Sequence, residues 1–188
     1  SNSMTVRITK PEFNLREKLT ELDYSQVPLQ KMPSGSVIQV IFGSTTTEAI
    51  RHHSNEGGTE THIFDTNLSA TISPKFTTSK ILVQINQSYM FVNNTSTQMQ
   101  ANIYISDGDN NILDGRTVDY DMLRVKNQVC FAGTHTAQLL HSPNTTSAFT
   151  YKTRGNFYHC EGGSGTLAFQ YSNKANLVST ISLMEIAQ

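Results

Sequence analysis

The sequence predicts an all-β fold, an antiparallel β-sandwich that is jelly-roll-like and follows a short N-terminal helical arm. Three observations predict it. Apolar and polar residues alternate along one long segment, turn-forming clusters divide the chain after residue 35 into about nine segments, and no repeat of about 20–50 residues recurs. The missing repeat argues against solenoids and propellers, and the strand count favours a sandwich.

The alternation is clearest between residues 80 and 92. Ile81, Val83 and Ile85 fall on one face of an extended chain, whereas Gln84 and Asn86 fall on the other. A period of two residues is typical of a strand that buries one face and leaves the other in water.

The remaining strands are placed by the same pattern and by the turns between them. The expected strands are 37–42, 62–65, 68–72, 81–92, 98–105, 128–140, 148–154, 166–171 and 178–186. The turn clusters, rich in Gly, Asn, Asp, Ser and Pro, are 55–58, 93–96, 107–111, 142–145 and 161–165.

The segment before the strands has a different pattern, that of a short helix. Asn14 and Glu17 have the spacing of a capping-box variant, and Leu15, Leu19 and Leu22 follow at i, i+4 and i+7. Two helical turns are not stable alone in water, so this leucine stripe needs a partner. It is either an assembly arm or a terminal arm folded onto its own domain, and the residues leave both open.

Prolines and a glycine between residues 28 and 35 predict an extended linker. The expected organisation is therefore an N-terminal arm over residues 1–34 and a β-sandwich domain over residues 35–188. Residues 1–3 (SNS) precede Met4 and are interpreted as a tag remnant.

Composition narrows the class of partner. The formal net charge is -1, and charged residues make up 15% of the chain, against about 25% in ordinary soluble domains. Such a chain has no electrostatic attraction to nucleic acid or to acidic lipid, and no apolar run is long enough for membrane insertion. Cys130 and Cys160 are either two reduced thiols of a protein made in a cytoplasm or one disulfide, with the thiols favoured.

The motifs that suggest chemistry each have a simpler interpretation. Asp107, Asp109 and Asn111 match the first ligands of a calcium loop, but Ile112 and Val118 occupy the positions of its glycine and glutamate. This segment is therefore expected to be a hairpin tip. The six histidines show no metal-ligand spacing, although one histidine per subunit on a threefold axis remains open, and His52 and His53 should point to opposite faces of a strand.

We expect no enzymatic activity and no cofactor. No Gly-x-Ser-x-Gly elbow is present, and the spacing of the acidic residues Asp114, Asp119, Asp121 and Glu161 does not pair them for glycoside hydrolysis. A polysaccharide-degrading activity that uses Asp119, Asp121 or Glu161 is the least favoured alternative.

Aromatic residues beside polar ones suggest a glycan contact, because sugar rings stack on aromatic faces. Phe149, Tyr151, Phe169 and Tyr171 are expected in the core, since they alternate along strands. The candidates for an exposed ligand or receptor contact are the residues next to the Gly-rich turn: Asn156, Phe157, Tyr158 and Glu161.

Four stretches together resemble a β-rich module of tail-fibre and other virion structural proteins of marine bacteriophages, including cyanophages. They are residues 36–40 (SVIQV), 72–83 (ISPKFTTSKILV), 142–152 (SPNTTSAFTYK) and 179–187 (STISLMEIA). The region that begins at Ile8 (ITKPEFNLREKL) resembles the start of small structural proteins of such phages. Residues 52–61 and 114–126 depart from the commoner members; if these segments are insertions, they are the expected places for partner-specific contacts.

The resemblance implies a virion component, made in the host cytoplasm, that assembles as a homotrimer and contacts other virion proteins. The leading hypothesis is a tail-fibre or particle-surface protein whose arm, through Leu15, Leu19 and Leu22, docks it to the particle. The alternative is a receptor-binding tip for host attachment that recognises a cell-surface glycan.

Overall fold

The computed structural model describes residues 28–53, 63–93, 98–113, 121–126, 130–161, 163–172 and 177–188, without the side chains of 93, 98, 121–126 and 158–161. Contacts divide the chain into two units, Ser1–Pro33 and Ser34–Gln188. In the first unit the described element is a 3₁₀ turn, η1 (Leu29–Lys31). Leu15, Leu19 and Leu22 lie outside the described residues, so the helical arm stays a prediction.

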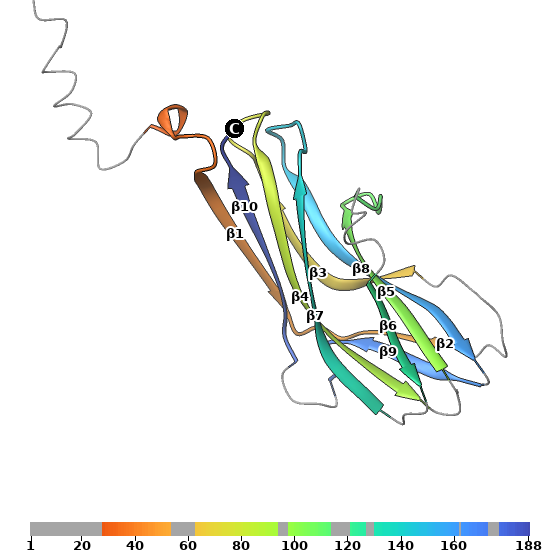
Figure 1. Cartoon of the computed structure of the whole chain (residues 1–188). Helices are drawn as coiled ribbons and strands as arrows, with labels where there is room; N and C mark the ends of the chain where they lie inside the picture. The colour runs from red at the N-terminus through yellow and green to blue at the C-terminus, as the bar shows by residue number, and fades with distance from the viewer. Residues whose placement is uncertain are drawn as a thin grey trace, which may run out of the picture. The chain divides into compact units, whose positions relative to one another are not determined.

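The second unit is built from antiparallel strands (Figure 1). They are β1 (Val37–Thr45), β2 (Ala49–His53), β3 (Ile63–Ile72), β4 (Lys80–Asn93), β5 (Gln98–Asp107), β6 (Asp121–Lys126), β7 (Cys130–His141), β8 (Phe149–Glu161), β9 (Gly165–Phe169) and β10 (Ser179–Ile186).

The strands form two sheets with a jelly-roll order. In the first sheet β4 pairs along one edge with β10 and then with β9, and along its other edge with β7; β1 flanks β10, and β2 flanks β9. The second sheet has the order β3-β8-β5-β6. If β1 with β2 and β9 with β10 are each counted as one broken strand, the orders become 1-8-3-6 and 2-7-4-5. This is the two-sheet, double Greek-key arrangement of a jelly roll, so the predicted fold class is confirmed.

The core lies between the two sheets and follows the alternation in the sequence. Ile81, Val83 and Ile85 of β4 are buried, while Asn86 is exposed, as the period of two predicts. The largest fully buried side chains come from both sheets: Tyr151, Phe91, Phe157, Phe169, Leu68, Ile72, Ile81, Ile85, Met99, Ile103, Leu167 and Ile181.

Three differences from the expected strands stand out. The segments 62–65 and 68–72 belong to one strand, β3, which is interrupted by a register shift between Asp65 and Ser69 and by Asn67 with a φ of 66°. Strand β2 was not expected. It has only five residues, and three of them in a row (Arg51, His52 and His53) are charged or polar, so no alternation is visible. Strand β6, which was not among the expected strands, lies within the segment 114–126.

A buried polar network connects the two broken strands. Gln170 follows β9, and the donors and acceptors around it assign its side-chain amide: Oε1 accepts from Gln87 Nε2 at 2.6 Å, and Nε2 donates to the carbonyl oxygens of Thr66 and Thr47 at 2.9 and 3.1 Å. Thr47 lies in the break between β1 and β2. The amide of Gln170 thus links the end of β9 to the break between β1 and β2 and to β3.

Candidate functional site

Two of the four residues predicted to contact a ligand, Asn156 and Phe157, are buried. Phe157 is 0% exposed, and its ring packs against those of Phe91 and His53 at centroid distances of 6.0 and 5.3 Å. Asn156 is buried and donates from Nδ2 to Tyr104 Oη at 3.4 Å. The expectation of an exposed Phe157 is therefore wrong, and Phe157 has no exposed surface with which to contact a glycan.

The reason for this error is the length of β8. The strand was expected to end at residue 154 but continues to Glu161, and its inward positions continue with it through Thr153, Gly155 and Phe157. Continued alternation was thus the signal that would have placed Phe157 in the core. The side chains of Tyr158 and Glu161 lie outside the described residues.

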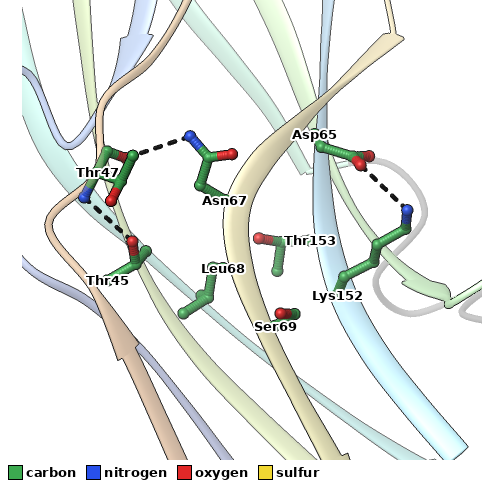
Figure 2. Close-up of a pocket in the computed structure, with 8 residues that line it drawn as sticks. All are labelled: Thr45, Thr47, Asp65, Asn67, Leu68, Ser69, Lys152 and Thr153. Carbon is green, nitrogen blue, oxygen red and sulfur yellow. Dashed lines mark hydrogen bonds and ion pairs between the residues drawn. The ribbon is translucent and has the colours of Figure 1, made fainter.

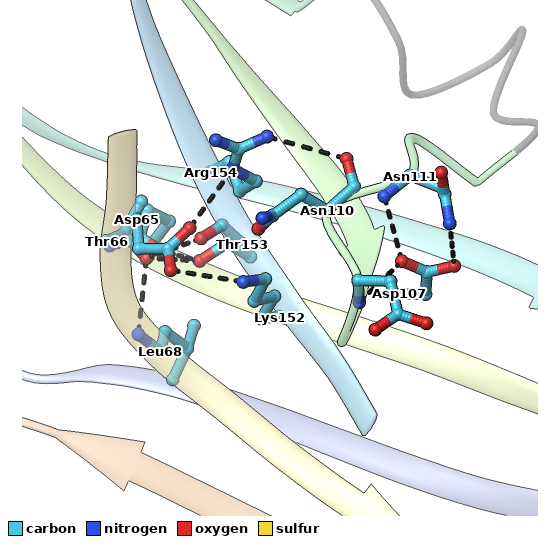
Figure 3. Close-up of polar contacts among 11 residues, drawn as sticks. Asp65, Thr66, Leu68, Asp107, Asn110, Asn111, Lys152, Thr153 and Arg154 are labelled. Carbon is cyan, nitrogen blue, oxygen red and sulfur yellow. Dashed lines mark hydrogen bonds and ion pairs between the residues drawn. The ribbon is translucent and has the colours of Figure 1, made fainter. Parts of the chain in front are cut away.

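The segment 107–111 is a hairpin tip, as expected (Figure 3). Asp107 Oδ1 accepts from the backbone amides of Asp109 and Asn111 at 3.0 and 2.8 Å, and Oδ2 accepts from Asn111 Nδ2 at 2.8 Å. Partial burial would raise the pKa of Asp107, but these hydrogen bonds and the charge of Lys152 lower it below its usual range. Both carboxylate oxygens thus already serve the turn.

The histidines on β2 point to opposite faces, as expected. His53 is buried, whereas His52 is exposed, with Nδ1 2.7 Å from Thr166 Oγ1. His141, at the end of β7, lies with Nδ1 2.9 Å from Tyr151 Oη. Burial lowers the pKa of His141, which the charge of Asp107 partly offsets. Within the described ranges, no three His, Cys, Asp or Glu residues gather as metal ligands would.

Three of the four stretches that carry the family resemblance meet at one buried carboxylate. Glu185 of β10 accepts from Gln39 Nε2 of β1 at 2.6 Å and from the backbone amides of Lys75 and Phe76 at 2.7 and 3.3 Å. Gln39 also donates to the carbonyl oxygen of Ser73 at 2.8 Å. These residues thus fasten the turn between β3 and β4 to the first sheet.

A pocket of about 370 Å³ lies beside β3 (Figure 2). Its lining residues are Thr45, Thr47, Asp65, Asn67, Leu68, Ser69, Lys152 and Thr153. Asp65 pairs with Lys152 and with Arg154, each at 3.1 Å (Figure 3). The lining has hydroxyl and amide groups but no aromatic ring, and its carboxylate is already paired with two cations. It therefore lacks the pair of facing carboxylates that glycoside hydrolysis requires.

The outer faces of the two sheets differ in charge. Asp65, Lys152 and Arg154 lie on the outer face of the second sheet. On the first sheet, alternation and register align twelve uncharged side chains in three rows on the outer face across β1, β10, β4 and β7; Lys80 lies on the same face one row beyond Leu82, opposite Ile186. We call the set of twelve the uncharged face: Val40, Phe42, Ser44, Thr180, Ser182, Met184, Leu82, Gln84, Asn86, Thr136, Gln138 and Leu140.

Exposed large apolar side chains are concentrated on the first sheet. Phe42 is 66% exposed, and Val40 and Leu140 are each 54% exposed. Isolated exposed apolar residues are ordinary, but a group of them on one uncharged sheet face is typical of an interaction surface. The fold and this face together define the chain as a jelly-roll β-sandwich with one surface suited to assembly.

No protein-family model and no curated protein matches this chain. Among solved structures, the chain is similar to the structure of the infectious bursal disease virus Gx strain, with 13% identity and a TM-score of 0.40 over 80% of this chain and 38% of that one. It is also similar to the VP2 subviral particle of the same virus (13% identity, TM-score 0.36, 87% and 42% covered) and to the Gt strain (12%, 0.34, 80% and 38%).

The chain thus spans about two fifths of the length of these solved structures. With TM-scores below 0.5, they carry no part of the argument below, which rests on this chain's own strands and residues. In the portion of the chain that the structure describes, no helix has the length and apolar character needed to span a membrane.

Proposed function

We propose that this chain is a bacteriophage virion structural protein, a tail-fibre or particle-surface component that assembles as a homotrimer and has no catalytic role. The uncharged face is the observation that carries the proposal. It presents apolar and neutral polar side chains on a sheet whose other face is already packed in the core. The sequence resemblance to phage modules supports the same assignment.

The physical chemistry of the face suits a permanent assembly. Apolar area removed from water contributes about 25 cal/mol per Å², and obligate interfaces bury more than about 2,000 Å² in total. An interface built on packing and neutral hydrogen bonds also loses little stability in concentrated salt, because it contains no surface ion pairs to screen. We expect such a particle component to work in the medium outside the cell after it is made in the host cytoplasm.

The first test is the molar mass of the full chain by light scattering. A homotrimer has three times the mass of one 20.9 kDa chain. A mass of 20.9 kDa at every concentration up to the millimolar range would refute the trimer.

The arm, residues 1–34, is proposed to dock the protein to other virion proteins. Replacement of Leu15, Leu19 and Leu22 by serine should leave the sandwich folded but remove the protein from particles. Replacement of three exposed threonines of the sandwich is the matched control. Normal incorporation of the leucine variant would contradict the docking role.

The alternative is a receptor-binding tip that recognises a host cell-surface glycan. The pocket beside Asp65 is the observation that favours it, because Thr45, Asn67 and Ser69 supply hydroxyl and amide groups that hydrogen-bond sugar hydroxyls. Titration of the assembled protein with host envelope polysaccharide tests this function. Binding that disappears in Asn67→Ala would favour the alternative, and no binding would exclude it.

A further inference from the structure

The register of the first sheet aligns four apolar side chains in one row across four strands. Val40 of β1 is opposite Met184 of β10, Met184 is opposite Leu82 of β4, and Leu82 is opposite Leu140 of β7. All four belong to the uncharged face, and the two ends of the row are each more than half exposed. Burial of this apolar row against a partner would therefore stabilise the assembly.

The next two rows are neutral and, apart from Phe42, polar. Phe42 continues through Ser182 and Gln84 to Gln138, and the row beyond it consists of Ser44, Thr180, Asn86 and Thr136. A shallow hollow of about 360 Å³ lies among these side chains and is lined by Gln84, Ile85, Asn86, Thr136, Ala137, Gln138 and Ser182. The face therefore combines an apolar strip with a band of amides and hydroxyls.

Strand β7, which carries Thr136, Gln138 and Leu140 of the uncharged face, is an edge strand of this sheet. Among the described strands β7 pairs only with β4, and its twelve residues contain no proline and no Asp, Glu, Lys or Arg. Phe131 is directly opposite the core residue Phe91, yet it remains 39% exposed. A long, uncharged edge strand that leaves core-facing side chains accessible is a surface that proteins normally cover.

We infer that a second copy of this chain covers the uncharged face, with the row from Val40 to Leu140 at the centre of the contact. In a symmetric oligomer, like residues approach one another around the axis, so charged groups there would repel. Amides and hydroxyls both donate and accept, which makes a face of Gln, Asn, Ser and Thr compatible with its own copy. Within the twelve residues a strongly charged partner would find no complementary charge, and Lys80 lies one row outside them.

This inference rests on the proposed self-assembly and specifies the surface that makes it. The test uses the full chain and Leu140→Glu, which places a charge at the exposed end of the apolar row. The expected result is a fall in molar mass from the oligomer to 20.9 kDa, while the circular dichroism of the β-sandwich is retained. The matched control is Ile112→Glu, since Ile112 is 45% exposed on the hairpin after β5, away from the uncharged face, and should leave the mass unchanged.

A second variant keeps the side-chain volume constant. Gln138→Glu places a carboxylate in the neutral band of every copy, so we expect at least a tenfold weaker association at low ionic strength. Most of that loss should be recovered at about 1 M salt, where the Debye length is about 3 Å. This salt dependence separates charge repulsion at a contact from a general loss of folding.

The outcomes are distinct. If the full chain is oligomeric and both variants keep its mass, the surface is wrong and the proposed self-assembly stands. If the unmodified full chain is monomeric throughout, the inference and the proposed trimer both fall. If Leu140→Glu changes only the protease sensitivity of the arm in a monomeric chain, the arm and not a second copy covers the face, and the inference is overturned.

Discussion

Gln87 Nε2 donates a hydrogen bond of 2.9 Å to Ser179 Oγ in the interior of the sandwich. Gln87 belongs to the middle of β4, and Ser179 is the first residue of β10, beside the break that separates β10 from β9. Ser179 Oγ also accepts from the backbone amide of Ser88 at 2.9 Å. This buried polar pair thus connects β4 to β10 at the position where the strand beside β4 changes from β10 to β9.

The first prediction concerns this pair. Ser179→Ala leaves the side-chain amide of Gln87 and the backbone amide of Ser88 short of an acceptor, and we expect unfolding free energy to fall by about 2 kcal/mol. Urea denaturation measures the change. Thr180→Ala, one residue along the same strand but on the outer face, should change it by less than about 0.5 kcal/mol. Equal effects of the two variants would show that the network contributes no stability.

The second prediction concerns Glu185, at which β1, β10 and the turn between β3 and β4 meet. Glu185→Ala removes the acceptor of Gln39 Nε2 and of two backbone amides, so a loss of about 3 kcal/mol is expected, with a smaller loss for Glu185→Gln. The control is Glu48→Ala, because Glu48 also accepts a backbone amide, that of Ser172 at 2.6 Å, but at an exposed site. The denaturant midpoints of the two variants measure the difference. A lower midpoint for Glu48→Ala than for Glu185→Ala would show that the buried carboxylate is dispensable.

A third prediction follows from the lowered pKa of His141, which burial causes. Since the unfolded chain then takes up the proton at a higher pH than the folded one, stability is full above the ordinary pKa of about 6.5. It should be lost as the pH falls from about 6.5 through the lower pKa of the folded state. The melting temperature, followed from pH 8 to pH 5, measures this loss.

The controls separate His141 from other groups. His141→Gln should reduce the dependence of the melting temperature on pH over this interval, whereas His52→Gln, at an exposed site, should not. Asp107 has a lowered pKa as well, so its contribution is lost only in the more acidic range, below about pH 4. An unchanged pH profile in His141→Gln would assign the loss to another group.

The fourth prediction concerns Gly155, at a close approach within the core. A Cβ at this position would lie 2.3 Å from the ring of Phe169 and 3.3 Å from that of Phe64. Because Phe169 is fully buried and cannot move aside, Gly155→Ala should cost about 3 kcal/mol or prevent folding. Gly108→Ala is the control, since its Cβ would make only an ordinary contact of 3.4 Å with Thr150. Thermal unfolding of both variants decides the point.

Local pattern was sufficient for the long strands. The alternation in β4, β5, β7 and β10 is visible in the sequence, and these strands lie within a few residues of the expected positions. Pattern failed for β2 and β6, which are five and six residues long. A short strand is fixed by the neighbour it pairs with, β9 for β2 and β5 for β6, and five or six residues by themselves leave little local signal.

The uncharged face was also predictable only in part from the sequence. The low charge of the chain as a whole is a property of composition, and the sequence alone determined it, together with the β-class and the inward side of each long strand. Which outward side chains share a row was decided by the register of four strands, since Val40 and Leu140 are separated by one hundred residues of chain. The length of β8 was likewise decided by tertiary structure: pairing with β3 and β5 extends the strand beyond residue 154, and the alternation already present in the sequence then places Phe157 in the core.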